Sequence, residues 1–420
     1  MKIQKITLIF AALLLAGSAS IQAFGQGLSQ GRSVGLANAF TSFARGVYAP
    51  SWNPANLALD DNPTFDFNLV GIGLHIGNST FSKHFYDVYN GKYLNNSDKE
   101  DILSRIPDSG FRLLSKEHLQ VLGFSVKSFA LTITGQAASN VTLDKDYMKL
   151  ALQGIDMNRR YDLSGTHGEG MSYSSLAFSG AHRFTVPYVD FLAVGVNLRY
   201  LFGIGYASVK TQKLEIYNSY NGNASGKLSG KYAIIGHGFG FDLGAATRWK
   251  GWNTGLAFSN LLASIKWTGE MHAHYDGFHT LTPLNVFSLS QVDQDSAVHV
   301  DTTETDLQPF STRLPLEMRV GVSRTWHKFL FAADYHQGFS NHAGVSPQPY
   351  LAVAGEWHGL GFLPLRFGLG LGGYYGISPA MGFGLHVGFF KFDIGWMFRG
   401  GLLPAYAKGI DLGLNMNLRF

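Results

Sequence analysis

The sequence predicts an all-β fold: a transmembrane antiparallel β-barrel of about fourteen strands, within a range of about twelve to sixteen, preceded by a small N-terminal segment. Three observations predict this fold. The chain begins with an export-type leader, its middle repeats segments in which apolar and polar residues alternate, and its last strand-like segment ends on an aromatic residue.

The leader has the pattern of a secretory signal. Lys2 and Lys5 form a short positive region before an apolar run over residues 6–16, and small residues follow. The run is shorter than the roughly 20 apolar residues that a membrane helix needs. We therefore expect a signal peptide over residues 1–25, with cleavage after Ala19 as the alternative.

The composition agrees with a barrel. A chain of 420 residues usually suggests several soluble domains, but a single barrel can absorb that length. Glycine (51 residues) and aromatic residues (14%) are abundant, whereas charged residues make up 15%, below the roughly 25% of soluble proteins. The mean hydropathy of +0.02 fits strands that show one face to lipid and the other to water.

Segments of alternating polarity predict the strands. In one of them, Val194, Val196 and Leu198 alternate with Gly195 and Asn197. An even number of such strands brings both ends of the barrel to the periplasmic side. The expected strands are 64–76, 118–126, 129–139, 170–184, 189–207, 236–249, 252–268, 312–325, 328–339, 348–358, 364–374, 379–388, 390–400 and 408–420.

The connections between strands alternate in length, as in outer-membrane barrels with short periplasmic turns and long extracellular loops. Short helices are expected near 98–107 and 144–152, and a further hairpin within 210–233. Tight turns are expected near Lys127–Ser128, Lys250–Gly251, His327–Lys328 and Phe390–Lys391. Long loops are expected at about 77–117, 140–168, 208–235, 269–311 and 340–347.

The last segment is a strict alternation that ends on Phe420. Leu412 and Leu414 lie on the apolar face, and Gly413 and Asn415 on the other. Outer-membrane barrels commonly end in this way, and that likeness implies recognition of Phe420 by the bacterial barrel-assembly machinery. We therefore expect the bacterial outer membrane as location and its lipid as a partner.

Between the leader and the first strand lies a distinctive segment, residues 26–63. It is rich in small residues, contains Arg45, and then reads Trp52-Asn53-Pro54-Ala55. Pro54 disfavours helix at Asn53, whose side chain can bond its own backbone to start a turn. The segment is too polar and irregular to face lipid, so we expect it inside the barrel or at its periplasmic mouth.

This motif resembles that of the FadL/TodX-type outer-membrane transporter superfamily, including PorV-like and uncharacterised barrels. The resemblance covers directly only the glycine-rich start and the Trp52–Ala55 motif; in the rest of the chain it is architectural. It implies that residues 26–63 act as a hatch, with Asn53, Pro54 and Arg45 as candidate hatch residues, inside a barrel over residues 64–420. The long loops show no clear fatty-acid-binding pattern, so the resemblance does not identify a substrate.

Charged residues within otherwise apolar strands are expected to point into the lumen. Two interpretations stay open: they line a permeation path, or they pair across strands to fill a closed interior. These candidate lumen residues are Asp242, Arg248, Glu317, Arg319, Asp334, Asp393 and Arg399.

The sequence shows no pattern for catalysis. It has no G-x-S-x-G elbow and no H-E-x-x-H, and Cys 0 excludes disulfides and thiolate chemistry. We expect no enzyme, no cofactor and no metal, and a net charge of +4 spread along the chain predicts no nucleic-acid partner. The expected function is passive transport of a small, hydrophobic ligand; the alternative is a PorV-like surface scaffold or shuttle for secreted proteins.

Overall fold

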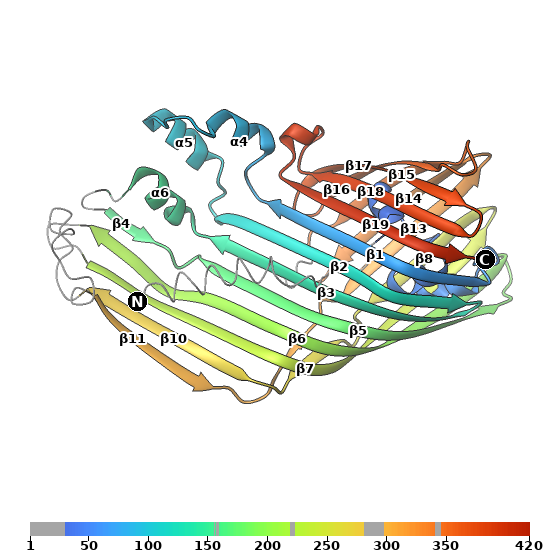
Figure 1. Ribbon diagram of the computed structural model, residues 1–420, viewed down its shortest axis with the longest axis horizontal. Helices are drawn as coiled ribbons and strands as arrows, with labels where there is room; N and C mark the ends of the chain where they lie inside the picture. Colours follow the sequence, from blue (N-terminus) through green and yellow to red (C-terminus); the bar gives the residue numbers. More distant parts are fainter. Residues whose placement is uncertain (1–29, 155, 157–158, 219–222, 281–297, 341–345) are drawn as a thin grey trace.

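The computed structural model describes residues 30–154, 156, 159–218, 223–280, 298–340 and 346–420. The expected signal peptide lies outside the described residues. In the described part, strands form one closed antiparallel barrel with fourteen wall positions, and β1 pairs with β19 to close it (Figure 1). The predicted fold class is therefore confirmed.

Twelve of the wall positions are single strands, and the other two are broken strands described below. The single strands are β1 (Phe65–Asn78), β2 (Phe111–Val126), β3 (Phe129–Leu143), β5 (His167–Phe184), β6 (Phe191–Asn218), β7 (Asn223–Trp249), β14 (Phe329–Gly338), β15 (Tyr350–Trp357), β16 (Leu365–Gly372), β17 (Gly376–Val387), β18 (Phe390–Arg399) and β19 (Gly409–Arg419).

The two broken strands are neighbours. One runs through β8 (Trp252–Ser259), β9 (Ser264–Trp267) and β10 (Met271–Thr280), and the next through β11 (Val298–Asp306), β12 (Phe310–Arg313) and β13 (Glu317–Trp326). They break side by side: Asn260, with a φ of 63°, donates its side-chain amide to the carbonyl of Pro315 at 2.7 Å. The wall is therefore locally irregular at this point.

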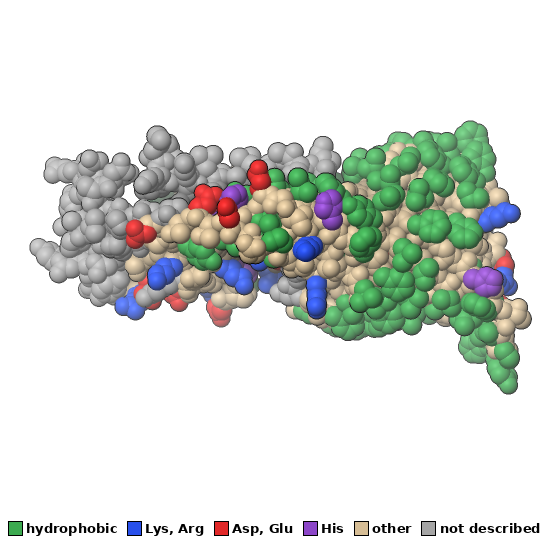
Figure 2. All heavy atoms as spheres, turned by 90° about the horizontal axis from the view of Figure 1, so that it is seen from below, with side chains coloured by type: hydrophobic (Ala, Val, Ile, Leu, Met, Phe, Trp, Pro, Cys, Tyr) green, Lys and Arg blue, Asp and Glu red, His purple; other side chains and the backbone are tan. Residues whose placement is uncertain are grey.

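Apolar side chains cover the outside of the barrel over one half of its length (Figure 2). This apolar belt lies in the half that holds the C-terminus. Its side chains alternate with inward polar ones: on β1, Ile72 and Ile76 are exposed while His75 is buried. This is the division that lipid outside and a closed interior require.

Beyond the belt the sheet continues outward. β6 and β7 have 28 and 27 residues, whereas a spanning strand needs about 10. Much of the expected loops at 208–235 and 269–311 is therefore strand, which corrects the prediction, although the hairpin expected within 210–233 is present. Above the lipid both faces of a strand meet water, so alternation gives a weaker signal.

Short helices lie at the same, loop-bearing end: α4 (Lys83–Tyr89), α5 (Asn96–Ser104) and α6 (Lys145–Gln153), with the short strand β4 (Arg159–Asp162). α5 and α6 confirm the two helices expected near 98–107 and 144–152. In the parts of the chain that the structure describes, no helix is long and apolar enough to cross a membrane.

The opposite end has tight turns. Lys127, Lys250 and His327 adopt positive φ angles of 51°, 49° and 54°, as two-residue hairpin turns require. The fourth tight turn is at Gly388–Phe389 rather than at Phe390–Lys391, because Gly388 adopts the positive φ of 55° there and β18 already begins at Phe390.

Candidate functional site

The described part of the expected hatch, residues 30–63, lies inside the belted half of the barrel (Figure 1). The first helix of the hatch ends at Gly35, and Ala37 and Asn38 then adopt left-handed φ angles of 50° and 66°. Nearly every residue up to Leu59 is buried. The elements of the hatch are α2 (Gly31–Gly35), η1 (Gly46–Tyr48), α3 (Ala49–Trp52) and η2 (Pro54–Ala58).

Asn53 and Pro54 act as the sequence suggests. Asn53 is extended, its side-chain oxygen accepts a bond from Ala55 N at 3.1 Å, and η2 begins at Pro54. The Asn53 amide also donates to the wall carbonyl of Ala245 at 2.9 Å. Asn53 therefore starts the local turn and also attaches the hatch to β7.

Inward-facing glycines let the hatch backbone approach the wall. A Cβ added at Gly195 would lie 2.3 Å from Ala55 N, and one at Gly368 would lie 2.5 Å from the carbonyl carbon of Leu36. At Gly395 it would lie 2.4 Å from Gly35 N. Any side chain at these positions would displace the hatch.

Apolar packing adds to this contact. Phe40 lies 4.9 Å from Phe43 and 5.5 Å from Trp52, ring centre to ring centre, in edge-on arrangements. These rings pack with Ala332 and Met397 of the wall in one buried cluster. The hatch is therefore packed as a core and not as a loose loop.

Wall side chains also accept hydrogen bonds from the hatch backbone and donate to it. Asp334, a predicted lumen residue, accepts from Phe40 N at 3.0 Å and from Thr41 N at 2.8 Å. Arg319, another predicted lumen residue, donates to the carbonyl of Ser51 at 3.0 Å. Both charges thus hold the hatch.

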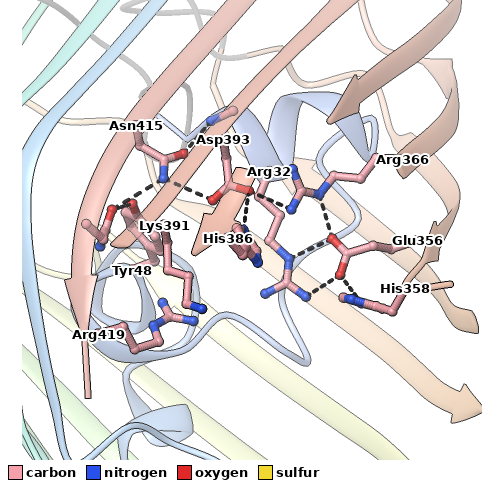
Figure 3. A network of polar contacts seen from close by, with 12 residues as sticks. Arg32, Tyr48, Glu356, His358, Arg366, His386, Lys391, Asp393, Asn415 and Arg419 are labelled. Atoms are coloured by element: carbon pink, nitrogen blue, oxygen red, sulfur yellow. Dashed lines mark hydrogen bonds and ion pairs between the residues drawn. The ribbon is translucent and has the colours of Figure 1, made fainter. Parts of the chain in front are cut away.

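A buried ionic network ties α2 to four strands, β15 to β18 (Figure 3). Arg32 donates to both oxygens of Glu356, at 2.8 and 2.7 Å, and Arg366 bridges Glu356 and Asp393 at 2.6 Å each. His386 lies 2.9 Å from Asp393. The side chains of Glu356 and Arg366 are fully buried, so each charge depends on its partners.

The network continues along β19. Asn415 donates to Asp393 at 3.2 Å and accepts from Gly31 N at 2.8 Å. Tyr48 donates its hydroxyl to Asn417 (Figure 3). Hatch and wall therefore share hydrogen bonds at several points of the same interior surface.

Arg45 forms its hydrogen bonds with other residues of the hatch rather than with the wall. Its side chain is 5% exposed and makes two bonds to Asp61, at 2.9 and 3.0 Å, and one to the carbonyl of Ala44 at 3.0 Å. Its partner Asp61 is exposed, and Arg248, another predicted lumen residue, lies 3.8 Å from that carboxylate. Arg248 also donates to Asn253 at 2.8 Å, so it lies at the mouth of the barrel.

The remaining predicted lumen charges are paired. Asp242 accepts from Arg199 at 2.8 Å, and both are buried. Glu317 accepts from Arg319 at 2.8 Å. Among the described residues these charges are therefore paired, and that some of them also line a permeation path stays a prediction.

That cavity, of about 180 Å³, lies above the hatch on the loop-bearing side. Trp52 and Asn38 of the hatch border it from below, and Ser346, Gln348 and Tyr374 border it from the loops. Its walls carry both apolar and charged side chains. The hatch and the cavity together form the candidate functional site.

Several site residues escaped the sequence analysis. Glu356 and Arg366 occupy polar positions of predicted strands, so the alternation could have found them. Lys116 borders the cavity but fell in the expected loop 77–117, because β2 begins earlier than expected. For Arg32 no sequence signal was available. Among the described residues no cluster of three or more His, Asp or Glu side chains could hold a metal ion.

The chain thus folds as a closed antiparallel barrel with a helical segment packed inside it. A family model described as "Family of unknown function (DUF5723)" matches residues 54–235. No curated protein matches the chain.

Solved structures resemble the chain over nearly its whole length. The Ralstonia pickettii toluene transporter TbuX is 15% identical, covers 96% of this chain and 99% of its own, and has a TM-score of 0.53. The P. putida toluene transporter TodX is 11% identical, with 96% and 99% covered and a TM-score of 0.52. A TodX deletion mutant, a monoaromatic hydrocarbon channel, is 10% identical, with 95% and 100% covered and a TM-score of 0.55. These likenesses confirm the predicted FadL/TodX-type resemblance at the level of the fold.

Proposed function

We propose that this chain lies in the bacterial outer membrane and passively passes a small, mostly hydrophobic molecule. Residues 26–63 would act as the hatch and 64–420 as the barrel, held by outer-membrane lipid and inserted by the barrel-assembly machinery through Phe420. The observation that carries the proposal is the cavity bounded from below by the hatch residues Asn38 and Trp52. The structural neighbours TbuX and TodX, described as transporters or channels, support transport over catalysis.

The proposed transport has two candidate exits from the cavity. One leads down to the periplasm and requires the packed hatch to move. The other leads sideways, because Asn260, Leu314 and Pro315 border the cavity and also form the break in the wall. An apolar solute could leave there directly into lipid.

A reversible lock would test the role of the hatch. The hydroxyls of Ser42 in the hatch and Ser323 in the wall lie 2.8 Å apart, so cysteines at both positions are placed to form a disulfide. The sequence contains no cysteine, so the two introduced cysteines could form a disulfide only with each other. The matched control joins Ser115 to Ser139, whose hydroxyls lie 2.9 Å apart within the wall.

Purified variants would be reconstituted in liposomes, and the rates of toluene and sugar entry would be measured relative to protein-free liposomes, because toluene also crosses lipid without a protein. If the hatch moves, oxidation of the Ser42/Ser323 pair lowers the toluene rate to the protein-free level and reduction restores it, while the control pair has no effect. A raised toluene rate in both redox states would point to the lateral exit. Rates equal to the protein-free level for every solute, in liposomes that hold folded protein, would sink the transport proposal.

The alternative function, a surface scaffold or shuttle for secreted proteins, is supported by a different observation. β6 and β7 carry the sheet far beyond the apolar belt (Figures 1 and 2), which provides a large surface outside the lipid. Co-purification of secreted proteins with the full chain, lost when residues 208–233 are replaced by a short turn, would favour this function. Solute entry without such partners would favour transport.

A further inference from the structure

The cavity has the size and lining for one aromatic ring. An engineered protein cavity of about 150 Å³ holds benzene, and this one is about 180 Å³. Among its lining residues are Trp52, Tyr173, Tyr350, Tyr374 and Tyr375. Such rings favour edge-on and offset contacts with another aromatic ring.

The acidic groups that border the cavity are already paired. Asp411 lies 2.5 Å from His75 Nδ1 and accepts from Arg399, also at 2.5 Å. Glu317 accepts from Arg319 at 2.8 Å. These carboxylates are therefore committed to cations of the wall.

One cation of the cavity has no such partner. Lys116 lies on β2 directly opposite His75 of β1 and borders the cavity. It is partly buried, and it makes no ion pair or hydrogen bond with any residue that the structure describes. The carboxylates of Glu317 and Asp411 act on the Lys116 ammonium through space but do not pair with it, so an anion directly beside this partly buried charge is still favoured.

A second cation lies on the loop-bearing side of Lys116. Arg112, four residues earlier on β2, places its guanidinium 5.0 Å from the ring centre of Tyr374, which borders the cavity. Its Nε is buried without a hydrogen-bond partner in the described structure. Positive charge thus follows β2 toward the cavity and would attract an anionic solute.

We propose that the cavity is a binding site for a small aromatic carboxylate, with Lys116 pairing with the carboxylate and the tyrosines and Trp52 around the ring. This inference rests on the proposed transport function and names its substrate class. It also distinguishes this chain from TbuX and TodX, which are described as transporters or channels for toluene or monoaromatic hydrocarbons.

Binding to the full-length folded barrel in detergent would test the proposal apart from transport. The probes are benzoate and benzamide, which have nearly the same shape and differ in charge, each measured by equilibrium dialysis. The variants are Lys116→Met, which removes the charge, and Lys116→Arg, which keeps it. Lys266→Met makes the same change at an exposed lysine of β9 and serves as the matched control.

We expect benzoate to bind the native barrel more tightly than benzamide does. Lys116→Met should weaken benzoate binding roughly ten- to hundredfold, because a hydrogen bond to a charged group is lost, and leave benzamide binding nearly unchanged. Lys116→Arg should retain most of the affinity, and Lys266→Met all of it. Equal binding of the two probes, or benzoate binding that survives Lys116→Met, would overturn the assignment even if liposomes still admit toluene. Loss of transport with benzoate binding intact would overturn only the transport function.

Discussion

The two halves of the barrel interior both contain paired charges, but they differ in one cation that has no ion pair among the described residues. At the level of the apolar belt, Glu356 and Asp393 are buried and each contacts several donors, including Arg366, which bridges them at 2.6 Å. In the cavity above the hatch, Lys116 has no partner in the described structure. Under the proposed function, the packed lower half stays closed and the upper half leaves Lys116 available to a solute.

The largest effect should come from breaking the lower network. Arg366→Met leaves Glu356 and Asp393 with fewer cations in a dry interior, and we expect a loss of about 3–5 kcal/mol of unfolding free energy. Urea unfolding in liposomes, followed by tryptophan fluorescence, would measure it. An unchanged unfolding midpoint would mean that these charges are hydrated, and the contrast between the two halves would disappear.

A smaller effect should follow from adding a side chain between hatch and wall. Gly195→Leu inserts atoms where Ala55 N lies 2.3 Å from the added Cβ, and overpacking costs about 1–3 kcal/mol. In a Ser42→Cys background the displaced hatch should react faster with a maleimide than it does without the leucine. The control is Gly361→Leu, because a Cβ there meets nothing within 4 Å. Equal labelling rates in both variants would argue against tight docking.

Removing the Lys116 cation, which has no ion pair with any described residue, should change the unfolding free energy in the opposite direction. Lys116→Met takes away a partly buried charge without breaking a pair, so stability should stay the same or rise by up to about 1 kcal/mol. The same urea assay would compare it with Arg366→Met. A loss as large as that of Arg366→Met would show that Lys116 has a structural partner.

The smallest effect concerns the loops outside both halves. Hydrogen bonds from Arg105 and Tyr89 lower the pKa of Asp101 below its usual 3.8. A lowered folded-state pKa contributes stability that is present above the unfolded value and is lost as pH falls through the folded value. An NMR titration of the Asp101 carboxyl should give a midpoint below 3.8 that rises in Arg105→Met. A titration midpoint of Asp101 that does not change in Arg105→Met would show that the Arg105 hydrogen bond does not lower the Asp101 pKa.

The wall was more predictable than the site. The expected strand at 390–400 is β18, Phe390–Arg399, because its large apolar residues alternate with a face that carries Lys391, Asp393 and Arg399. The expected strand at 189–207 stopped short of the true end of β6 at Asn218, because its outer part has water on both faces. In the hatch, the turn at Asn53 was predictable, since the Asn-Pro signal acts within a few residues.

The sequence alone determined the barrel, because lipid on one face and a closed interior on the other impose a period of two that each strand records locally. Only the tertiary structure decided which charges meet. Arg32 reaches Glu356 across 324 residues of chain, and their encounter depends on closure of the barrel and on the depth of the hatch. By the same logic Lys116 is unpaired because closure assigns the nearby Asp411 to His75 and Arg399.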